Sequence, residues 1–127
     1  MYTADPWIER HIAARTLSPG ARGMDRAGVA GQYNAANALT PADPDFLFTP
    51  DQAQPTARAM LNHVGITVGD GTIVVLTDAD DTGPDGREYR INVGQLEGAC
   101  EQHRLVSGNA ISADAIVAAL PWAEPQW

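Results

Sequence analysis

Two runs of β-branched residues, separated by a short glycine-containing segment, form the strongest local pattern in the sequence. Residues 66–68 and 72–76 consist almost entirely of Ile, Val and Thr, and residues 69–71 read Gly-Asp-Gly. Such runs favour strands, and a short connection containing glycine is typical of a β-hairpin. A third run, residues 87–93, alternates apolar with polar side chains, as a half-buried strand does. Since the connections are short, we expect three antiparallel strands in a meander.

Helical patterns lie on both sides of this predicted sheet. Residues 49–63 begin with Thr-Pro, a favourable helix start, with Pro55 after Gln54 as a second possible start, and carry a stripe of apolar side chains before a glycine. Residues 94–105 and 112–120 show helical spacing after the sheet, with Ser112 as the expected cap and Pro121 as the stop. The sequence therefore predicts an α+β fold, with a three-stranded antiparallel meander packed by helices before and after it.

The N-terminal third of the chain is patterned more weakly. Asp5 and Pro6 are typical first residues of a helix, which would run to about Thr16. Residues 19–44 are rich in Gly, Ala, Asn and Pro, and only their alanine content suggests a short helix near residues 30–39. A connection of this length is usually functional or disordered. We therefore expect an N-terminal arm with a short helix at 1–45, and a compact α+β domain with an extended C-terminal tail at 46–127.

Charge and composition exclude several classes of partner. The net charge is −8, the pI is about 4.5, and all eight basic residues are Arg, a bias that a GC-rich genome explains. Binding to a phosphate backbone or to anionic lipids needs a basic surface, so we expect neither nucleic acid nor membrane as a partner. The chain has one cysteine, no basic-apolar leader and no apolar run long enough to span a bilayer. We expect a cytoplasmic protein, or part of a particle assembled in the cytoplasm.

An acidic segment follows the second β-branched run. It contains Asp78, Asp80, Asp81, Asp85 and Glu88. The segment opens like a calcium-binding loop, but the twelfth position, where such loops need a bidentate glutamate, is Tyr89. The flanking residues also resemble strands rather than helices. A solvated loop is the favoured interpretation, with attraction to a basic partner surface as the functional alternative.

Cys100 and His103 form the second candidate group. They follow Glu97 at three-residue spacing, which places all three side chains along one helix face, and His63 could join them after folding. A zinc site needs at least three protein ligands in most cases. However, Cys100 coincides with the apolar stripe of its helix, so a buried structural cysteine is the favoured interpretation. We expect no metal and no cofactor.

The tryptophans lie near the two ends of the chain. Trp7 shares a predicted helix face with Ile8 and Ile12, and Trp122 and Trp127 lie in the tail. Tryptophan is enriched at the centres of protein interfaces, because it buries a large area at a modest cost in entropy. These five residues are the candidates for partner binding, with docking onto the chain's own domain as the alternative.

No catalytic motif is present in the sequence. The chain has no nucleophile elbow and no phosphate-binding glycine loop, and a cysteine in mid-helix beside acidic residues is poorly placed as a nucleophile. We therefore expect a non-enzymatic interaction or assembly protein, a structural or accessory subunit of a larger complex such as a virus particle, with no small-molecule substrate. It would bind a protein partner or further copies of itself through arm and tail. The alternatives are an acidic inhibitor of the antitoxin or immunity type, and a small metal- or thiol-dependent enzyme.

Overall fold

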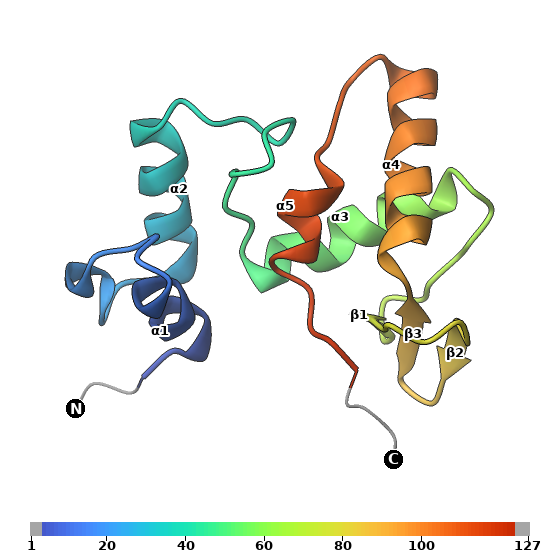
Figure 1. Ribbon diagram of the computed structural model, residues 1–127, viewed down its shortest axis with the longest axis horizontal. Helices are drawn as coiled ribbons and strands as arrows, with labels where there is room; N and C mark the ends of the chain where they lie inside the picture. The colour runs from blue at the N-terminus through green and yellow to red at the C-terminus, as the bar shows by residue number, and fades with distance from the viewer. Residues whose placement is uncertain (1–3, 124–127) are drawn as a thin grey trace.

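The computed structural model describes residues 4–123, which form two lobes with separate hydrophobic cores (Figure 1). The N-terminal lobe contains helix α1 (Pro6–Ala13), the 3₁₀ helix η1 (Pro19–Ala21) and helix α2 (Arg26–Ala36). The main lobe contains helix α3 (Pro50–Asn62), strands β1 (Ile73–Leu76), β2 (Gly83–Asp85) and β3 (Glu88–Ile91), and helices α4 (Val93–Ser107) and α5 (Ala113–Val117). The predicted α+β class is confirmed. Within residues 4–123, no helix has the length and apolar character needed to cross a bilayer.

Local capping signals define where the helices begin. The Asp5 carboxylate accepts hydrogen bonds from the backbone amides of Trp7 and Ile8, at 2.9 and 3.3 Å. Thr49 begins α3 through a reciprocal capping box, and Ser112 caps α5. Each cap satisfies amides that have no partner within the helix. The predicted helix starts at Asp5, Thr49 and Ser112 are therefore confirmed.

The sheet is mixed, so the predicted antiparallel meander is wrong. Its strand order is β1-β3-β2, with β1 parallel to β3 and β2 antiparallel to β3. Residues 66–68, predicted as the first strand, lie outside the sheet. The run that follows them is a strand in which Val74, Val75 and Leu76 are all buried. A strand with both faces covered is typical of parallel pairing, and the short connections concealed this arrangement.

The hairpin that forms joins β2 to β3. Asp85 pairs with Glu88 across the two-residue turn at Gly86 and Arg87. Gly86 has a φ of 60°, which glycine adopts without a steric penalty and which suits this type of hairpin turn. The strand predicted within residues 87–93 is thus confirmed as β3, but its pairing partners differ from those expected.

Both edges of the sheet are protected against pairing with another strand. On β1, the side-chain amide of Gln54 bonds to both the N–H and the C=O of Val74, each at 2.9 Å. The tail, residues 121–123, bonds to the N–H and C=O of Leu76 at 2.8 and 2.7 Å. On β2, Pro84 has no N–H to offer an added strand. Strand addition is therefore disfavoured at either edge.

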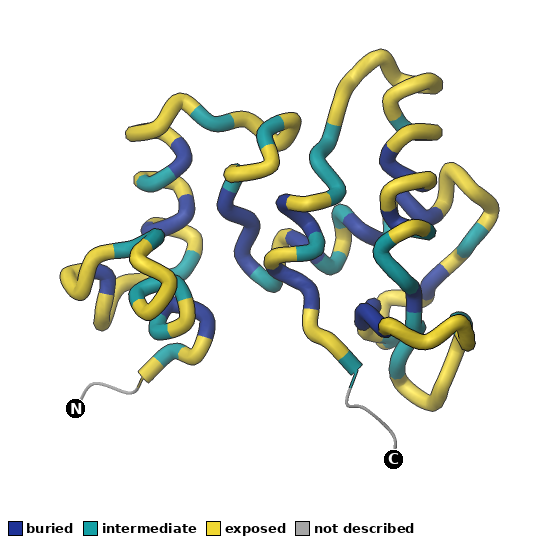
Figure 2. The backbone as a smooth tube through the Cα atoms, viewed as in Figure 1, coloured by how far each residue is buried: buried dark blue, intermediate teal, exposed yellow. Residues whose placement is uncertain are grey.

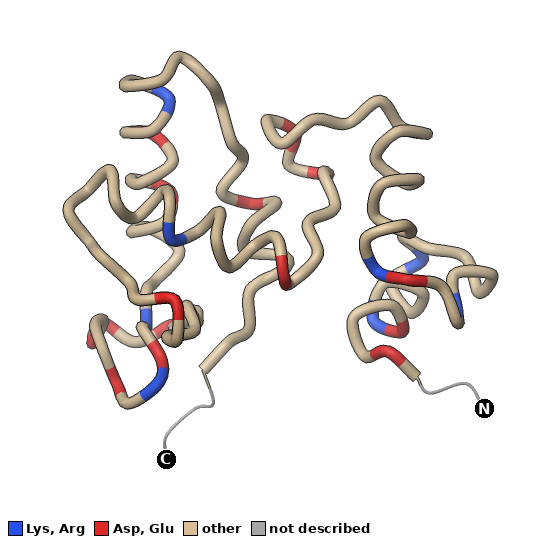
Figure 3. Tube along the Cα trace, turned by 180° about the vertical axis from the view of Figure 1, so that it is seen from behind, with Lys and Arg blue, Asp and Glu red and all other residues tan. Residues whose placement is uncertain are grey.

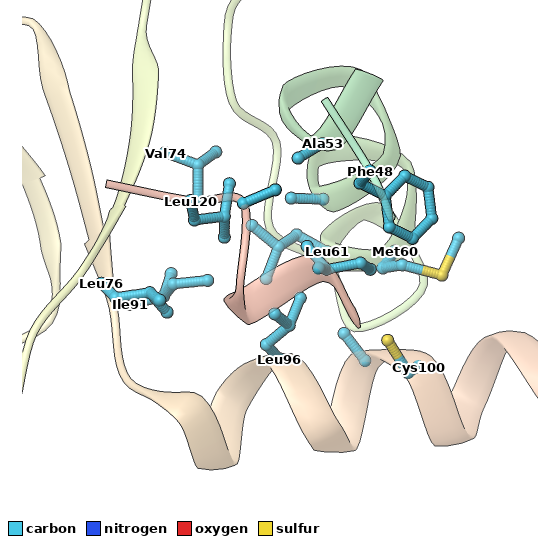
Figure 4. Packing of buried hydrophobic residues seen from close by; sticks show 14 of the residues in the cluster. Phe48, Ala53, Met60, Leu61, Val74, Leu76, Ile91, Leu96, Cys100 and Leu120 are labelled. Carbon is cyan, nitrogen blue, oxygen red and sulfur yellow. The ribbon is translucent and has the colours of Figure 1, made fainter. Parts of the chain in front are cut away.

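The main-lobe core lies between α3, α4, α5 and the sheet (Figure 4). Its buried members are Phe48, Ala53, Ala57, Met60, Leu61, Val68, Val74, Leu76, Ile91, Leu96, Ala99, Cys100, Ala115, Ile116, Ala119 and Leu120. The N-terminal core is smaller and consists of Trp7, Ile8, Ala21, Val29, Ala30 and Leu47. Figure 2 shows these buried stretches on both sides of a largely exposed connection.

The chain passes from one core to the other between Leu47 and Phe48, which pack into different lobes. Asn34, buried in α2, fixes this point with two hydrogen bonds. Its side-chain amide donates to the Leu47 carbonyl at 3.0 Å and accepts from the Leu47 amide at 2.8 Å. The connection is also held on the other side, since the Ser112 amide donates to the Pro41 carbonyl at 2.7 Å. Residues 19–44 are therefore more completely folded than the sequence predicts.

Candidate partner-binding cleft

A cleft of about 490 Å³ lies where the two lobes meet. It is lined by Pro6, Trp7, Arg10, Arg26, Pro50, Asp51, Gln54, Ile73, Ala119, Leu120 and Pro121. These residues come from α1, α2, the start of α3, β1 and the segment after α5, so elements from both lobes contribute. Most of the lining is apolar and a few polar groups are placed among it, which is the usual composition of a binding pocket.

Helix α1 forms the N-terminal wall of the cleft. Its cap, Asp5, accepts a hydrogen bond from Nε of Arg26 at 2.6 Å, which ties α1 to α2. The Arg26 guanidinium is the main reason that the pKa of Asp5 lies below its ordinary value, and amides of the first turn of α1 lower it further. The same contact raises the pKa of Arg26. Both groups are therefore charged at neutral pH.

Arg10 connects this wall to the main lobe. Its guanidinium donates to the backbone carbonyl of Ala118 at 2.7 Å, between residues 108 positions apart. Arg10, Arg26 and Asp51 line the cleft, and because Arg26 is paired with Asp5 the charges around it balance within a chain whose net charge is −8. Figure 3 shows how acidic positions otherwise recur along the main lobe.

The opposite wall exposes large apolar side chains. Ile73 begins β1 and is 50 % exposed, although the next three residues of the strand are buried. Pro121 also lines the cleft, and Trp122, the next residue, is 48 % exposed but is not part of the lining. The backbone bonds between the tail and Leu76 hold this wall in place. The tail is thus fixed to the sheet while its tryptophan remains accessible.

The arm residues singled out from the sequence lie deeper than Trp122. Trp7 is 4 % exposed and Ile8 fully buried, so they build the N-terminal core, while Ile12 is half-buried against it. Of these three, only Trp7 lines the cleft. Packing within the chain's own fold therefore accounts for the apolar character of Trp7 and Ile8. Trp127, the remaining candidate, lies outside the described residues.

Known proteins offer no family in which to place this cleft. No family model, curated protein or solved structure matches the chain.

The acidic residues Asp78, Asp80, Asp81, Asp85 and Glu88 divide into two sets. The first three are exposed in the loop between β1 and β2. The last two flank the β2–β3 turn and form ion pairs with Arg90, at 3.0 and 3.3 Å. In the part of the chain that the structure describes, no three His, Cys, Asp or Glu side chains are grouped as metal ligands. This loop lines none of the cleft.

Cys100 is separated from the histidines with which the sequence associated it. It is buried in the main-lobe core, on the face of α4 turned toward α3 (Figure 4). Burial, and secondly the nearby Glu97, raise the pKa of its thiol to about 11. A thiol with this pKa is protonated at neutral pH, which is the unreactive form. The structure does bring His63 and His103 together, with Nε2 and Nδ1 3.0 Å apart.

Sequence reasoning missed the polar residues that position the cleft. Arg10 and Gln54 each bond to backbone groups of distant segments, and Asn34 fixes the connection between the lobes. Nothing in their local sequence distinguishes them from other polar residues on a helix surface. Their roles follow only from contacts between residues 13 to 108 positions apart.

Proposed function

We propose that this protein is a non-enzymatic interaction protein that binds an apolar segment of a partner protein in the cleft between its lobes. The N-terminal lobe and the C-terminal tail supply opposite walls, so both ends of the chain take part. An accessory or structural subunit of a larger assembly would use such a surface. The partner inferred from the lining is a polypeptide that presents at least one large apolar side chain.

The exposed apolar side chains at the cleft carry this proposal. Ile73 lines the cleft and is about half exposed, and Trp122, which directly follows the lining residue Pro121 but does not itself line the cleft, is exposed to the same extent. Scattered apolar side chains are common on protein surfaces, but apolar groups gathered around a concave lining favour an interaction site. Tryptophan is among the residues that contribute most to binding energy at such sites.

The closed sheet edges restrict the ways in which a partner can bind. Because Gln54 and the tail already occupy the free edge of β1, a partner would insert side chains rather than add a strand. Arg10 uses one donor on Ala118 and retains others, which could bind a carbonyl or carboxylate of the partner. The cleft therefore suits an apolar side chain beside a hydrogen-bond acceptor.

Paired affinity capture with surface variants tests the proposal. Ile73→Asp changes an exposed side chain of the lining, Trp122→Ala changes the exposed side chain that follows the lining residue Pro121, and both leave the buried core intact. Leu105→Asp and Val106→Asp are matched controls, since these α4 residues are 61 and 73 % exposed and line none of the cleft. We expect a partner that binds the wild type and both control variants, and that is lost from both cleft variants.

The recovered partner should then be purified and titrated into each protein by calorimetry. We expect its dissociation constant to rise about fivefold or more for Trp122→Ala, because removing a tryptophan that contributes to an interface typically costs more than about 1 kcal/mol. Circular dichroism should show that all four variants remain folded. A partner that binds the cleft variants as tightly as wild type, or that is lost only from the α4 variants, would contradict the proposal.

A further inference from the structure

Two histidine side chains join the end of α3 to α4. His63 is the C-cap of α3, and its Nε2 lies 3.0 Å from Nδ1 of His103 in α4. The ring centroids are 4.9 Å apart. His63 is exposed and His103 half-buried, so solvent reaches the pair. Neither side chain lines the interlobe cleft.

Ser107 determines which nitrogen of His103 carries the proton. The Ser107 hydroxyl donates its hydrogen to a backbone carbonyl, that of His103 at 2.7 Å or that of Asn109 at 3.5 Å. A hydroxyl has one hydrogen, so its 3.3 Å contact with His103 Nε2 must be an N–H donated to Oγ. His103 in its neutral form therefore has its lone pair on Nδ1, the nitrogen that faces His63.

We propose that His63 and His103 bind a divalent transition-metal ion of the zinc class between His63 Nε2 and His103 Nδ1. Two nitrogens each about 2.1 Å from a tetrahedral ion lie about 3.4 Å apart, so the observed pair needs to widen by only a few tenths of an ångström. In the metal-free pair Nε2 of His63 donates its hydrogen to Nδ1 of His103, and on metal binding that proton moves to Nδ1 of His63, which leaves a lone pair on each ligating nitrogen. Imidazole nitrogens select Zn²⁺, Ni²⁺ and Cu²⁺ over the oxygen-seeking Mg²⁺ and Ca²⁺.

The surroundings of His103 resemble those of a metal-binding histidine. Such residues usually donate their second ring N–H to an oxygen, which fixes the tautomer and orients the ring. Ser107 supplies that oxygen from the next turn of α4. Water would complete the coordination, because Cys100 faces the main-lobe core and the described residues offer no third side chain at this position.

Calorimetric titration of the full chain with Zn²⁺, in a buffer that does not chelate metal, tests the site. We expect the wild type to bind one ion per chain, and His63→Gln and His103→Gln to lose this binding. Ser107→Ala keeps both ligands but loses the oxygen that orders His103, so its affinity should fall about tenfold or more. Gln102→Ala, an exposed neighbour on α4, is the matched control and should bind like wild type.

Thermal unfolding provides a second measurement that does not depend on heats of binding. An ion that bridges α3 and α4 binds the folded state alone and should raise the unfolding midpoint of the wild type but not of either histidine variant. Wild type that binds no Zn²⁺ at millimolar metal, or one-to-one binding that persists in both histidine variants, would overturn the proposal.

Discussion

The two lobes differ in how much they bury and in how well their polar atoms are paired. Within residues 4–123, the main-lobe core has 16 buried members and the N-terminal core has six. Among the described side chains, the two buried polar atoms without a hydrogen-bond partner are Nε1 of Trp7 and Nε2 of His11. Both lie in the N-terminal lobe, which is the small lobe of the two. The small lobe thus gains less from apolar burial and also bears unpaired polar groups. We expect it to open at a lower free energy than the main lobe.

Directional polar contacts compensate for the small core by fixing its position. Asn34 holds Leu47, Asp5 pairs with Arg26, and Arg10 reaches across to the main lobe. Such contacts specify a geometry more than they add stability, since each exchanges a bond to water for a bond to protein. One wall of the cleft is therefore well placed yet easily opened, which suits a surface that adjusts to a partner.

Truncating one core side chain in each lobe should reveal the largest difference in stability between the two lobes. Leu61→Ala, at a fully buried position of the main core, should lower the free energy of global unfolding by about 2–5 kcal/mol, as measured in urea. Ile8→Ala should expose amides of the N-terminal lobe to hydrogen exchange and leave protection of α3 and α4 unchanged. If Ile8→Ala destabilised α3 and α4 to the same extent, the lobes would form one cooperative unit.

Asn34→Ala should open the small lobe next most strongly. It leaves the amide and carbonyl of Leu47 without their partners at a buried site, at a cost of about 2–3 kcal/mol. Hydrogen exchange should rise across α1 and α2. Asn37→Ala is the matched control, because Asn37 is exposed and bonds only within its own helix, to the Tyr33 carbonyl. Equal effects of the two substitutions would refute the proposed role of Asn34.

Gln54→Met tests the same kind of contact inside the main lobe. It removes both bonds to Val74 at an only partly buried site, so we expect a loss of about 1–2 kcal/mol. The loss should appear in the global unfolding midpoint, in contrast to Asn34→Ala. The uncovered edge of β1 should also make the variant more prone to self-association, as measured by sedimentation. Unchanged stability and unchanged association would show that Gln54 does not protect this edge.

Mild acid should destabilise the small lobe selectively, and we expect this to be the smallest of the four predicted effects on stability. Burial, and secondly Arg10, lower the pKa of His11 below its ordinary value of 6.5. The open lobe therefore takes up a proton more readily than the folded one, so stability falls as the pH drops below 6.5, until His11 is also protonated in the folded lobe. The pKa of Asp5 is also lowered, so its charged carboxylate stabilises the folded lobe above pH 3.8. This stabilisation is lost only in stronger acid.

Hydrogen exchange corrected for its intrinsic pH dependence measures this difference. We expect the opening free energy of α1 to fall between pH 7 and pH 5 in wild type and to remain flat in His11→Gln. His63→Gln, in the main lobe, should keep the wild-type dependence. A pH dependence that survives in His11→Gln would assign it to another group.

Much of the secondary structure could be predicted because its signals are local. Asp5, Thr49 and Ser112 cap helices through contacts within one turn, and the sequence displays them directly. The pairing of β1 with β3 could not be predicted, because adjacent runs with a glycine turn favour a hairpin by local rules alone. The cleft was equally inaccessible, since it requires Arg10 to meet a residue 108 positions away. The tryptophans near the chain ends were the usable signal in the sequence, since Trp7 lines the cleft and Trp122 follows the lining residue Pro121.

A hydrogen-exchange footprint of the bound partner on the intact protein tests the proposed binding surface most directly. If the cleft is the functional surface, partner binding should increase protection in α1, at the start of α3 and in residues 119–123, and leave the β1–β2 loop unchanged. Protection confined to the exposed aspartates at 78–81, with the cleft segments exchanging as in the free protein, would contradict the proposal and favour an acidic inhibitor.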